Sequence, residues 1–245
     1  MNGGEGDQIG TSIFNKHHRD NTFGGRKVLN IGCGFAKFSA KNVINVDAFD
    51  NCRPDIVWDL NKTPYPFETG TFDLILANHI IEHLPNWWDC FNECSRILKE
   101  NGKLEIWVPG SGADTILGYR DHCNTINNCS FFGVMGTYRS ESNAWADDAL
   151  NKNRWANRME LECRVIHLEN EWWLQKAPTF MKDWFAKHLR NVIKEDGYFF
   201  RRVTEVEYQK EMQGYVKNIK NRRETVNLRV PEQVMAEAVR KAHRE

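Results

Sequence analysis

A short segment between two predicted strands constrains the fold of this chain more than any other feature. The apolar run Val28–Ile31 predicts a strand that ends in the turn Gly32-Cys33-Gly34, and Val43–Asp47 predicts the next strand. Only eight residues, Phe35 to Asn42, lie between Gly34 and that second strand. Because a helical crossover needs at least about 10–12 residues, the first helix of this unit must be a turn or absent.

The same spacing discriminates between nucleotide ligands. A glycine turn lets a ligand approach the backbone, and Asp47 at the end of the second strand is placed to accept hydrogen bonds from both ribose hydroxyls. The third glycine of the dinucleotide fingerprint is replaced by Lys37. Without a first helix there is no helix N-terminus to hold a pyrophosphate. The pattern therefore disfavours NAD, FAD and nucleoside triphosphates, and it tolerates a ligand with a ribose and an adenine but no phosphate.

Three further strands complete an α/β pattern. They are predicted at Ile56–Leu60, Phe72–Ala77 and Leu104–Val108, and the second of these is apolar enough to be buried on both faces. A helix before the last strand has Pro85 in its first turn, and Asn101-Gly102 is its predicted stop. Its apolar face comprises Trp87, Phe91, Cys94 and Leu98. Strands in this order, with short or helical crossovers, predict a Rossmann-like, doubly wound and mostly parallel sheet.

The remaining segments are predicted to flank this sheet. Residues 1–25 are polar and Gly-rich at the start and predict a flexible N-terminal arm, so the domain itself is expected to span residues 26–204. Within it, residues 111–160 are rich in Asn, Ser, Asp and Gly, which is typical of a lid insertion or a loop. Residues 205–245 predict a charged helical tail. Further elements are expected at 161–169 (strand), 179–194 (amphipathic helix) and 198–200 (strand).

Charge and cysteine content exclude several classes of protein. Lys+Arg and Asp+Glu are equal at 33 each, so the total charge gives no argument for binding nucleic acid or an anionic membrane. The seven cysteines are odd in number and include no C-x-x-C pair, which argues against a disulfide framework and against a zinc site. There is neither a signal peptide nor a long apolar run. We therefore expect a cytoplasmic protein without a metal site and without a membrane partner.

Six motifs in sequence order resemble those of class I methyltransferases of the methyltransferase type 11 kind, and are most similar to members with a shortened first helix. They are Val28-Leu-Asn-Ile-Gly-Cys-Gly34, Asn45-Val-Asp47, Asp55-Ile-Val-Trp-Asp-Leu60, Pro64-Tyr-Pro-Phe67, Phe72-Asp73 and His79-Ile-Ile-Glu-His-Leu84. The resemblance covers roughly residues 26–110 and continues weakly to about residue 135. It implies the class I methyltransferase fold, S-adenosylmethionine as the cofactor and methyl transfer as the activity.

The resemblance also implies roles for individual residues in binding the cofactor. Gly32 and Gly34 would line its methionine and ribose portion, and Asp47 would bind the ribose hydroxyls. Asp59 and the backbone of Leu60 would recognise the adenine edge.

Three more residues complete the implied site. Asn30 stands where many members have Asp, so its contact with the cofactor's amino group would be a weakened or variant one. Asn78 and His79 would face the methyl group at the end of the fourth strand.

Each candidate also has a structural alternative. The glycines could form an ordinary strand–loop turn, Asp47 could be a helix cap or a solvated strand end, and Asp59 could cap the loop before Pro64. Glu82 and His83 are more often structural at a helix start than catalytic.

An oxygen or nitrogen acceptor can also require a general base. The candidates are His79, His83 and His122, of which His79 and His122 are selected as catalytic. His122 lies in the segment from Tyr119 to Phe132, which is predicted to form part of a lid at the carboxyl edge of the sheet. This segment weakly resembles an Asp-Pro-Thr-His stretch of related methyltransferases but lacks the Pro-Thr. A surface loop pinned by its two phenylalanines is the alternative.

The acceptor is expected to be a small molecule or a glycan. The sequence Asn78-His79-Ile80-Ile81 lacks the Asn/Asp-Pro-Pro-Tyr/Phe element of methyltransferases that act on exocyclic amines of nucleic-acid bases, so a nucleic-acid partner is disfavoured. Two alternatives stay open. One is an RNA or protein methyltransferase that docks through the basic tail, since residues 201–245 carry 11 − 7 = +4 charges. The other is a non-catalytic module that binds S-adenosylmethionine.

Overall fold

The computed structural model describes residues 23–110, 112–131, 158–168, 172–191 and 193–210. The chain divides into two compact units, Met1–Val203 and Thr204–Glu245, which we treat separately. Three predictions lie largely outside the described residues: the N-terminal arm, the second half of the lid region, and most of the charged tail.

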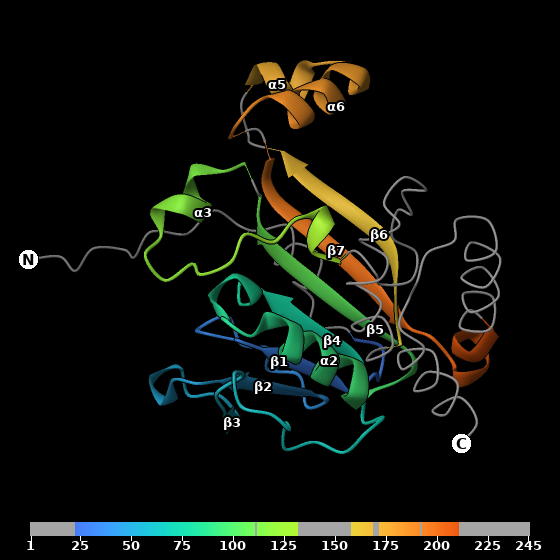
Figure 1. The fold of residues 1–245 in the computed structure, drawn as a ribbon. Coiled ribbons are helices and arrows are strands. Elements are labelled where there is room, and N and C mark those ends of the chain that lie inside the picture. The colour runs from blue at the N-terminus through green and yellow to red at the C-terminus, as the bar shows by residue number, and fades with distance from the viewer. Residues whose placement is uncertain (1–22, 111, 132–157, 169–171, 192, 211–245) are drawn as a thin grey trace, which may run out of the picture. The chain divides into compact units, whose positions relative to one another are not determined.

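The first unit is built on one seven-stranded sheet with the order β3-β2-β1-β4-β5-β7-β6 (Figure 1). The strands are β1 (Val28–Ile31), β2 (Val43–Asp47), β3 (Ile56–Val57), β4 (Phe72–Asn78), β5 (Leu98–Pro109), β6 (Met159–Leu168) and β7 (Ile193–Arg202). The strands β3, β2, β1, β4 and β5 pair in parallel, and β7 runs antiparallel between β5 and β6. The predicted Rossmann-like, mostly parallel sheet is therefore confirmed.

The connection from β1 to β2 contains turns and no helix, as its length of eight residues after Gly34 requires. Among its described residues, the first unit has the helices α2 (Trp87–Ile97), α3 (Asp114–Gly118), α5 (Trp172–Lys176) and α6 (Thr179–His188), with short 3₁₀ turns η1 (Asp50–Cys52), η2 (Ile81–His83) and η3 (Asn128–Phe131). Among the described residues, none of the helices is long and apolar enough to cross a membrane.

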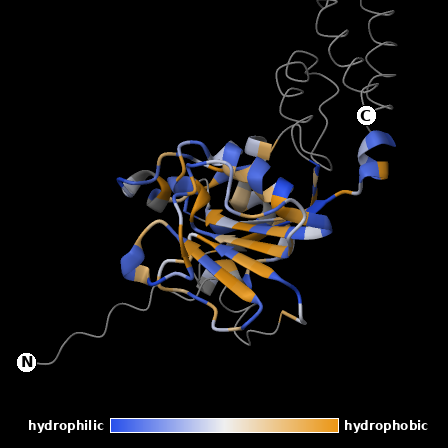
Figure 2. Cartoon of the chain, turned by 90° about the horizontal axis from the view of Figure 1, so that it is seen from below, coloured by the Kyte–Doolittle hydropathy of each residue, from blue (hydrophilic) through white to orange (hydrophobic). Residues whose placement is uncertain are grey.

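Apolar side chains fill both faces of the sheet. Figure 2 shows that the strands are largely apolar. On one face, α2 buries Phe91, Cys94 and Ile97 against Ile75 and Ile106 (Figure 1). A second cluster comprises Phe23, Val28, Val43, Leu74, Leu76 and Trp107. Parallel sheets are normally buried on both faces, as this one is. The packing holds in place the strand ends that carry the candidate site.

Several predicted boundaries are wrong. The strand β5 begins at Leu98, six residues before the predicted Leu104, and β7 begins at Ile193 and not at residue 198. Pro85 precedes the N-cap Asn86 of α2 and does not lie in its first turn. The helix α2 ends at Ile97 because Leu98 is buried and pairs with Phe72 in the sheet. The predicted stop Asn101-Gly102 instead makes a bend inside β5, where Asn101 has a φ of 62°.

The third strand is shorter than predicted, since it ends at Val57 and the backbone of Trp58 donates to the carbonyl of Asp47 (2.8 Å). The helix α6 ends at His188 rather than near residue 194. Asn191, with a φ of 56°, turns the chain into β7.

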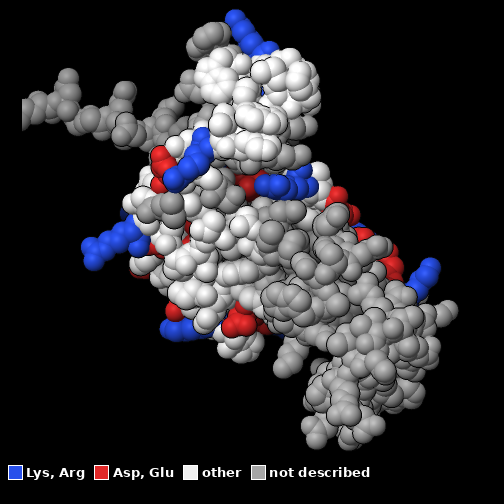
Figure 3. Space-filling model, turned by 45° about the horizontal axis from the view of Figure 1, so that its top comes forward, with Lys and Arg blue, Asp and Glu red and all other residues white. Residues whose placement is uncertain are grey.

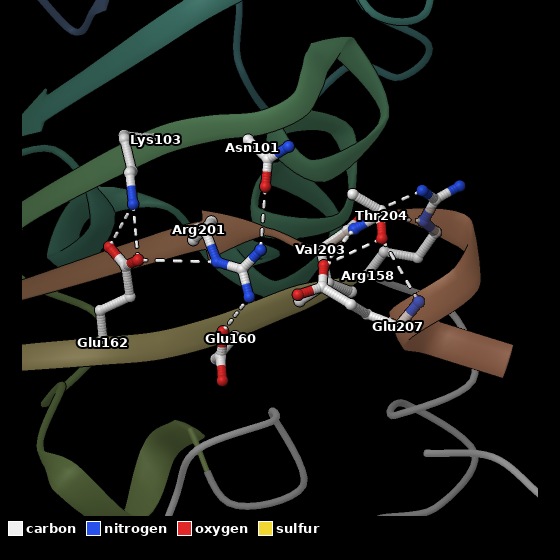
Figure 4. Close-up of polar contacts among 9 residues, drawn as sticks. All are labelled: Asn101, Lys103, Arg158, Glu160, Glu162, Arg201, Val203, Thr204 and Glu207. Atoms are coloured by element: carbon white, nitrogen blue, oxygen red, sulfur yellow. Dashed lines mark hydrogen bonds and ion pairs between the residues drawn. The ribbon is translucent and has the colours of Figure 1, made fainter. Parts of the chain in front are cut away.

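Ion pairs cross the outer strands of the sheet (Figure 4). Arg201 of β7 contacts Glu160 of β6 (2.6 Å) and donates to Asn101 of β5 (2.9 Å), and Lys103 of β5 contacts Glu162 of β6 (2.5 Å). These polar contacts connect β5, β6 and β7 at the antiparallel edge of the sheet, where the strands are partly exposed.

The described part of the second unit is the start of a helix over residues 205–210. The Thr204 hydroxyl accepts a hydrogen bond from the backbone of Glu207 (3.3 Å), whose carboxylate accepts one from the backbone of Thr204 (2.9 Å) (Figure 4). This reciprocal pair is a capping box. It defines the helix start within the predicted charged tail.

Candidate active site

The candidate residues gather at the carboxyl ends of β1, β2 and β4. The strand β1 lies between β2 and β4, and the strand order changes direction at this position. In open α/β sheets, ligands bind in the crevice outside the carboxyl ends of the strands at such a switch point.

The glycine turn after β1 is hydrogen-bonded to the acid that ends β2. The backbone of Gly34 donates to Oδ2 of Asp47 (2.8 Å), and the backbone of Phe49 donates to its Oδ1 (2.9 Å). A carboxylate offers about four acceptor positions, so each oxygen keeps room for another donor. Gly34 has a φ of 48°, and a Cβ at this position would meet nothing within 4 Å. The backbone there is open to a ligand, beside a largely buried carboxylate.

Gly32 has a structural role that its sequence does not reveal. Its φ is 61°, and a Cβ at this position would lie 2.3 Å from the side chain of Ile80. A residue other than glycine would therefore be strained and would collide with the segment after β4. Contact between Gly32 and the cofactor stays a prediction.

The amide of Asn30 is bonded within the protein. Its Nδ2 donates to Oδ1 of Asn45 (3.1 Å) and to the carbonyl of Ala36 (3.4 Å), and the residue is 2% exposed. In this arrangement Asn30 stabilises the β1–β2 connection. A contact between this nitrogen and a cofactor would require it to leave these partners.

Asp59 and Leu60 lie in the loop after β3, next to the end of β2. Oδ1 of Asp59 accepts from the backbone of Asn61 (3.0 Å), and its Oδ2 lies 3.8 Å from the ammonium of Lys62. The carbonyl of Leu60 accepts from the Tyr65 hydroxyl (2.9 Å). Asp59 therefore closes a turn, as the structural alternative expected, and its contact with an adenine stays a prediction.

Asn78, the last residue of β4, carries an unsatisfied polar atom. Its Oδ1 is buried and has no hydrogen-bond partner within the described part of the chain. Buried polar atoms are normally paired, and an exception calls for an explanation such as a missing ligand. Asn78 is thus a candidate ligand contact at the centre of the sheet edge.

His79 follows Asn78 and lies between two carboxylates. Its Nδ1 is 3.2 Å from Oε1 of Glu82, and its Nε2 is 2.9 Å from Oε1 of Glu195. Burial disfavours the charged ring, but the hydrogen bonds to Glu195 and Glu82 outweigh it and raise the pKa of His79 to about 9. The backbone of His79 has a φ of 51°, a conformation that is uncommon for a residue with a side chain. The ring is therefore a cation with both nitrogens engaged.

Glu195 was missed by the sequence analysis. It enters the site because β7 runs antiparallel, which brings its first residues beside the end of β5, with Glu195 opposite Pro109. The sequence signal that could have identified Glu195 is its position three residues before the predicted strand Tyr198-Phe199-Phe200.

His122 lies against the 3₁₀ turn η2. Its ring packs edge-on against the ring of His83, with centroids 4.7 Å apart, and stacks on Tyr119 at 5.1 Å. The backbone amides of Cys123 and Asn124 both donate to the carbonyl of Glu82 (2.9 and 3.1 Å). The structure thus brings His122 close to η2, which begins two residues after His79.

The rest of the segment predicted as a lid is partly a core element. Phe131 is fully buried among Phe91, Tyr198 and Phe200. Phe132 lies outside the described residues. Phe131 therefore pins the segment, as the alternative proposed.

Two exposed aromatic residues flank the Gly34–Asp47 pair. Phe35 is 80% exposed and Phe49 is 69% exposed. Both rings lie close in sequence to the open backbone of Gly34 or the carboxylate of Asp47, which makes them candidates for contact with a ligand. Their positions directly after Gly34 and two residues after Asp47 are the sequence signal that could have identified them.

Comparison with known proteins agrees with this geometry. Residues 29–106 match a family model described as a methyltransferase domain. This region is a class I methyltransferase domain of the type 11 kind. The match spans the glycine turn, Asp47 and the end of β4, and the cofactor of such a domain is S-adenosylmethionine. It confirms the resemblance found from the motifs.

The methyltransferase domain also has a curated relative. It is 36% identical over 90 residues to an uncharacterized protein of Methanocaldococcus jannaschii, in a match that covers 33% of this chain and 40% of the relative. The chain thus spans about 40% of the length of that protein.

The chain is also similar, at low sequence identity, to solved structures. One is an S-adenosylmethionine-dependent methyltransferase from Mesorhizobium loti, at 14% identity, a TM-score of 0.46, and coverage of 73% of this chain and 92% of the other. Another is a SAM-dependent methyltransferase from Archaeoglobus fulgidus, at 12% identity, a TM-score of 0.45, and coverage of 77% and 91%. The fold assignment itself rests on the strand order of this chain.

Proposed function

We propose that this chain is an S-adenosylmethionine-dependent methyltransferase that acts on a small molecule or a glycan. The observation that carries the proposal is the pairing of Asp47 with Gly34 at the carboxyl edge of the sheet (2.8 Å). It holds a carboxylate with spare acceptor positions beside an open stretch of backbone. The family match over residues 29–106 supports the same activity.

The residues present fit this cofactor. Asp47 would accept the ribose hydroxyls, the open backbone at Gly34 would allow close approach, and the unpartnered Oδ1 of Asn78 would receive a donor. Asp59 and the Leu60 backbone would recognise the adenine. When bound, S-adenosylmethionine supplies a methyl group already activated by a sulfonium. The protein then has to position the acceptor and exclude water.

The two histidines take different roles in this proposal. His79 has both ring nitrogens against carboxylates, so it is a positioning residue that joins the end of β4 to Glu195 of β7. His122 has a buried Nδ1 without a hydrogen-bond partner among the described residues. That nitrogen is available to take or hold a proton, which makes His122 the candidate acid–base residue. His122→Ala should lower turnover while leaving the affinity for S-adenosylhomocysteine unchanged.

The surface supports a small acceptor more than a polyanion. On the face seen in Figure 3, basic and acidic side chains of the described residues are interspersed. Nucleic-acid binding relies on clustered basic side chains and weakens steeply with salt. An RNA or protein acceptor, reached through the charged tail, remains the second candidate because residues 201–245 carry 11 − 7 = +4 charges.

Two measurements test the proposal. Calorimetry should show binding of S-adenosylhomocysteine and none of NAD, and the opposite result would overturn it. Methyl transfer from labelled S-adenosylmethionine should then be assayed on small hydroxylated compounds, glycans, RNA and protein extracts. Transfer to RNA with steep salt dependence would favour the second candidate. Cofactor binding without transfer to any class would favour a non-catalytic module.

A further inference from the structure

A cluster of Glu82, His83 and His122 lies beside the candidate active site, and two of its members, Glu82 and His83, have no role in the proposed function. One possible ligand atom from each residue lies within 4.8 Å of the other two. Glu82 and His83 come from η2, whereas His122 comes from the segment after α3. This site was not predicted from the sequence, because the cysteines show no paired spacing and 38 residues lie between the two histidines.

The carboxylate of Glu82 is buried and only half satisfied. The side chain is fully buried, and Oε1 lies against His79, but Oε2 has no hydrogen-bond partner in the described part of the chain. A buried carboxylate is costly unless it is paired or coordinates a metal. Its free oxygen therefore requires a cation or donor that the described residues do not supply.

His83 is oriented as a metal ligand would be. Its Nδ1 lies 3.2 Å from the carbonyl of Asp121 and 3.3 Å from the carboxylate of the same residue. Metal-binding histidines almost always donate the proton of one ring nitrogen to a carbonyl or carboxylate, which leaves the other nitrogen as the ligand. Here the acceptors at Nδ1 leave Nε2 available.

His122 completes the set with the same nitrogen that makes it the acid–base candidate. A bound metal ion would replace that role, because one lone pair cannot hold a proton and a metal ion at once. Its Nδ1 is buried and unpaired within the described residues. The hydrogen bonds from the Cys123 and Asn124 backbone to Glu82 hold this segment against η2 without any ion. The amide of Asn124 adds a bond to the carbonyl of Leu84 (2.6 Å). The three side chains are thus brought together by the backbone.

We propose that Glu82, His83 and His122 form a binding site for one divalent transition-metal ion, of which Zn²⁺ is the best match. Two imidazoles and one carboxylate are a known zinc ligand set that leaves a fourth position open. Ligand atoms around a tetrahedral zinc ion lie about 3.3 Å apart, given bonds of about 2.0–2.1 Å. The side chains must therefore close by about 1–2 Å around the ion.

The open position gives the ion a use in methyl transfer. It takes an oxygen of the acceptor, and coordination lowers the pKa of a bound hydroxyl so that the oxygen becomes a better nucleophile. As the oxygen–methyl bond forms, the methyl–sulfur bond of S-adenosylmethionine would break and release S-adenosylhomocysteine, while the proton of the hydroxyl would leave to solvent or to a nearby base. This second step rests on the proposed function, whereas metal binding does not.

The test measures metal binding directly on the full chain after chelator treatment. Titration with Zn²⁺, followed by elemental analysis, should give one ion per chain. Glu82→Gln and His122→Ala should each lower the affinity by at least tenfold. Asp121→Asn, which alters only the partner of His83, should lower it by about 10–100-fold. The control is His188→Ala at the end of α6, which should bind zinc as the parent does.

Cobalt gives a second readout that does not depend on the folding of a variant. Co²⁺ bound to the parent chain should show the visible absorption of a nitrogen and oxygen site. Strong thiolate-to-cobalt absorption would place the ion on cysteines and overturn the proposal, as would the absence of stoichiometric binding. Equal affinity in the parent and the Glu82 and His122 variants would also overturn it. Binding of S-adenosylhomocysteine, measured in parallel, tests the proposed function separately.

Discussion

The side-chain amide of Asn45 hydrogen-bonds both backbone polar groups of Phe38. Its Oδ1 accepts from the Phe38 N–H (3.1 Å), and its Nδ2 donates to the Phe38 carbonyl (3.0 Å). The β1–β2 connection is too short for a helix, so its backbone groups need other partners. Asn45 supplies them from the neighbouring strand, while Asn30 supports Asn45 from β1 (3.1 Å). Two buried amides thus replace the missing helix and hold the glycine turn in place.

Asn45→Ala should therefore destabilise the domain. The substitution removes two hydrogen bonds to the Phe38 backbone and one to the carboxylate of Asp55 (2.7 Å). Loss of a hydrogen-bond partner by a buried polar group costs about 1–3 kcal/mol. Denaturant unfolding is the measurement, and Asn51→Ala on the exposed turn η1 is the control, expected within about 0.5 kcal/mol of the parent. Equal stability of Asn45→Ala and the control would contradict the assignment.

Asp47 should be essential for binding the cofactor. Because its carboxylate also accepts from the backbones of Gly34 and Phe49, alanine would remove a turn support together with the charge. Asp47→Asn removes the charge and keeps one acceptor oxygen, so it retains one of these two backbone hydrogen bonds. Charge-assisted hydrogen bonds contribute about 1.5–3 kcal/mol, so S-adenosylhomocysteine should bind at least about tenfold more weakly.

Calorimetry checks this prediction, with Asp50→Asn on the neighbouring turn as the control. Asp47→Ala should weaken binding strongly without unfolding the domain, with a small additional loss of stability. If Asp47→Asn bound S-adenosylhomocysteine as tightly as the parent, Asp47 would have only its structural role.

Gly197 of β7 should not tolerate a side chain. A Cβ at this position would lie 2.8 Å from the ring of Trp107, which is 1% exposed. Overpacking of this kind costs about 1–3 kcal/mol. Gly197→Ala should therefore lower the midpoint of thermal unfolding. Gly112→Ala is the matched control because its nearest contact would be 3.9 Å away, and equal losses in both variants would refute the packing argument.

The parallel strands of the sheet could be predicted from the sequence, but the side-chain contacts between distant strands could not. The strands β1, β2 and β4 could be predicted because their burial on both faces gives continuous apolar runs. The position of Asp47 beside the glycine turn followed from that order. Glu195 could not be predicted, since it reaches His79 only through the antiparallel pairing of β7 with β5. Side-chain partners formed over such distances in sequence leave no local pattern.

The buried amides illustrate the same limit. Asn30 matches a family position for cofactor binding, yet its Nδ2 is bonded to Asn45 and Ala36. The proximity of His83 and His122 likewise depends on backbone bonds between η2 and a distant segment. Periodicity predicts which face a residue occupies, but it does not predict which polar partner it finds there.

The carboxylate of Glu93 organises the loop before β4. It accepts from the backbone of Tyr65 (2.6 Å) and pairs with the guanidinium of Arg96 (2.7 Å). Arg96 in turn donates to the carbonyls of Phe67 and Tyr65 (2.9 and 3.2 Å). Burial raises the pKa of Glu93, but the hydrogen bonds from Arg96 and Tyr65 outweigh it, so the pKa lies below its ordinary value.

A carboxylate whose pKa is lower in the folded state stabilises the protein above its unfolded pKa, which is about 4.3 for Glu. This contribution is lost as the pH falls through the lower, folded value. Glu93→Gln should therefore cost about 1–3 kcal/mol at pH 7, and the difference from the parent should shrink below about pH 4. Urea unfolding across this pH range is the measurement. Glu68→Gln, an exposed carboxylate on the same loop, should show little change at any pH. If the difference in stability between Glu93→Gln and the parent stayed constant with pH, the charge of Glu93 would not contribute to stability, and the prediction would be wrong.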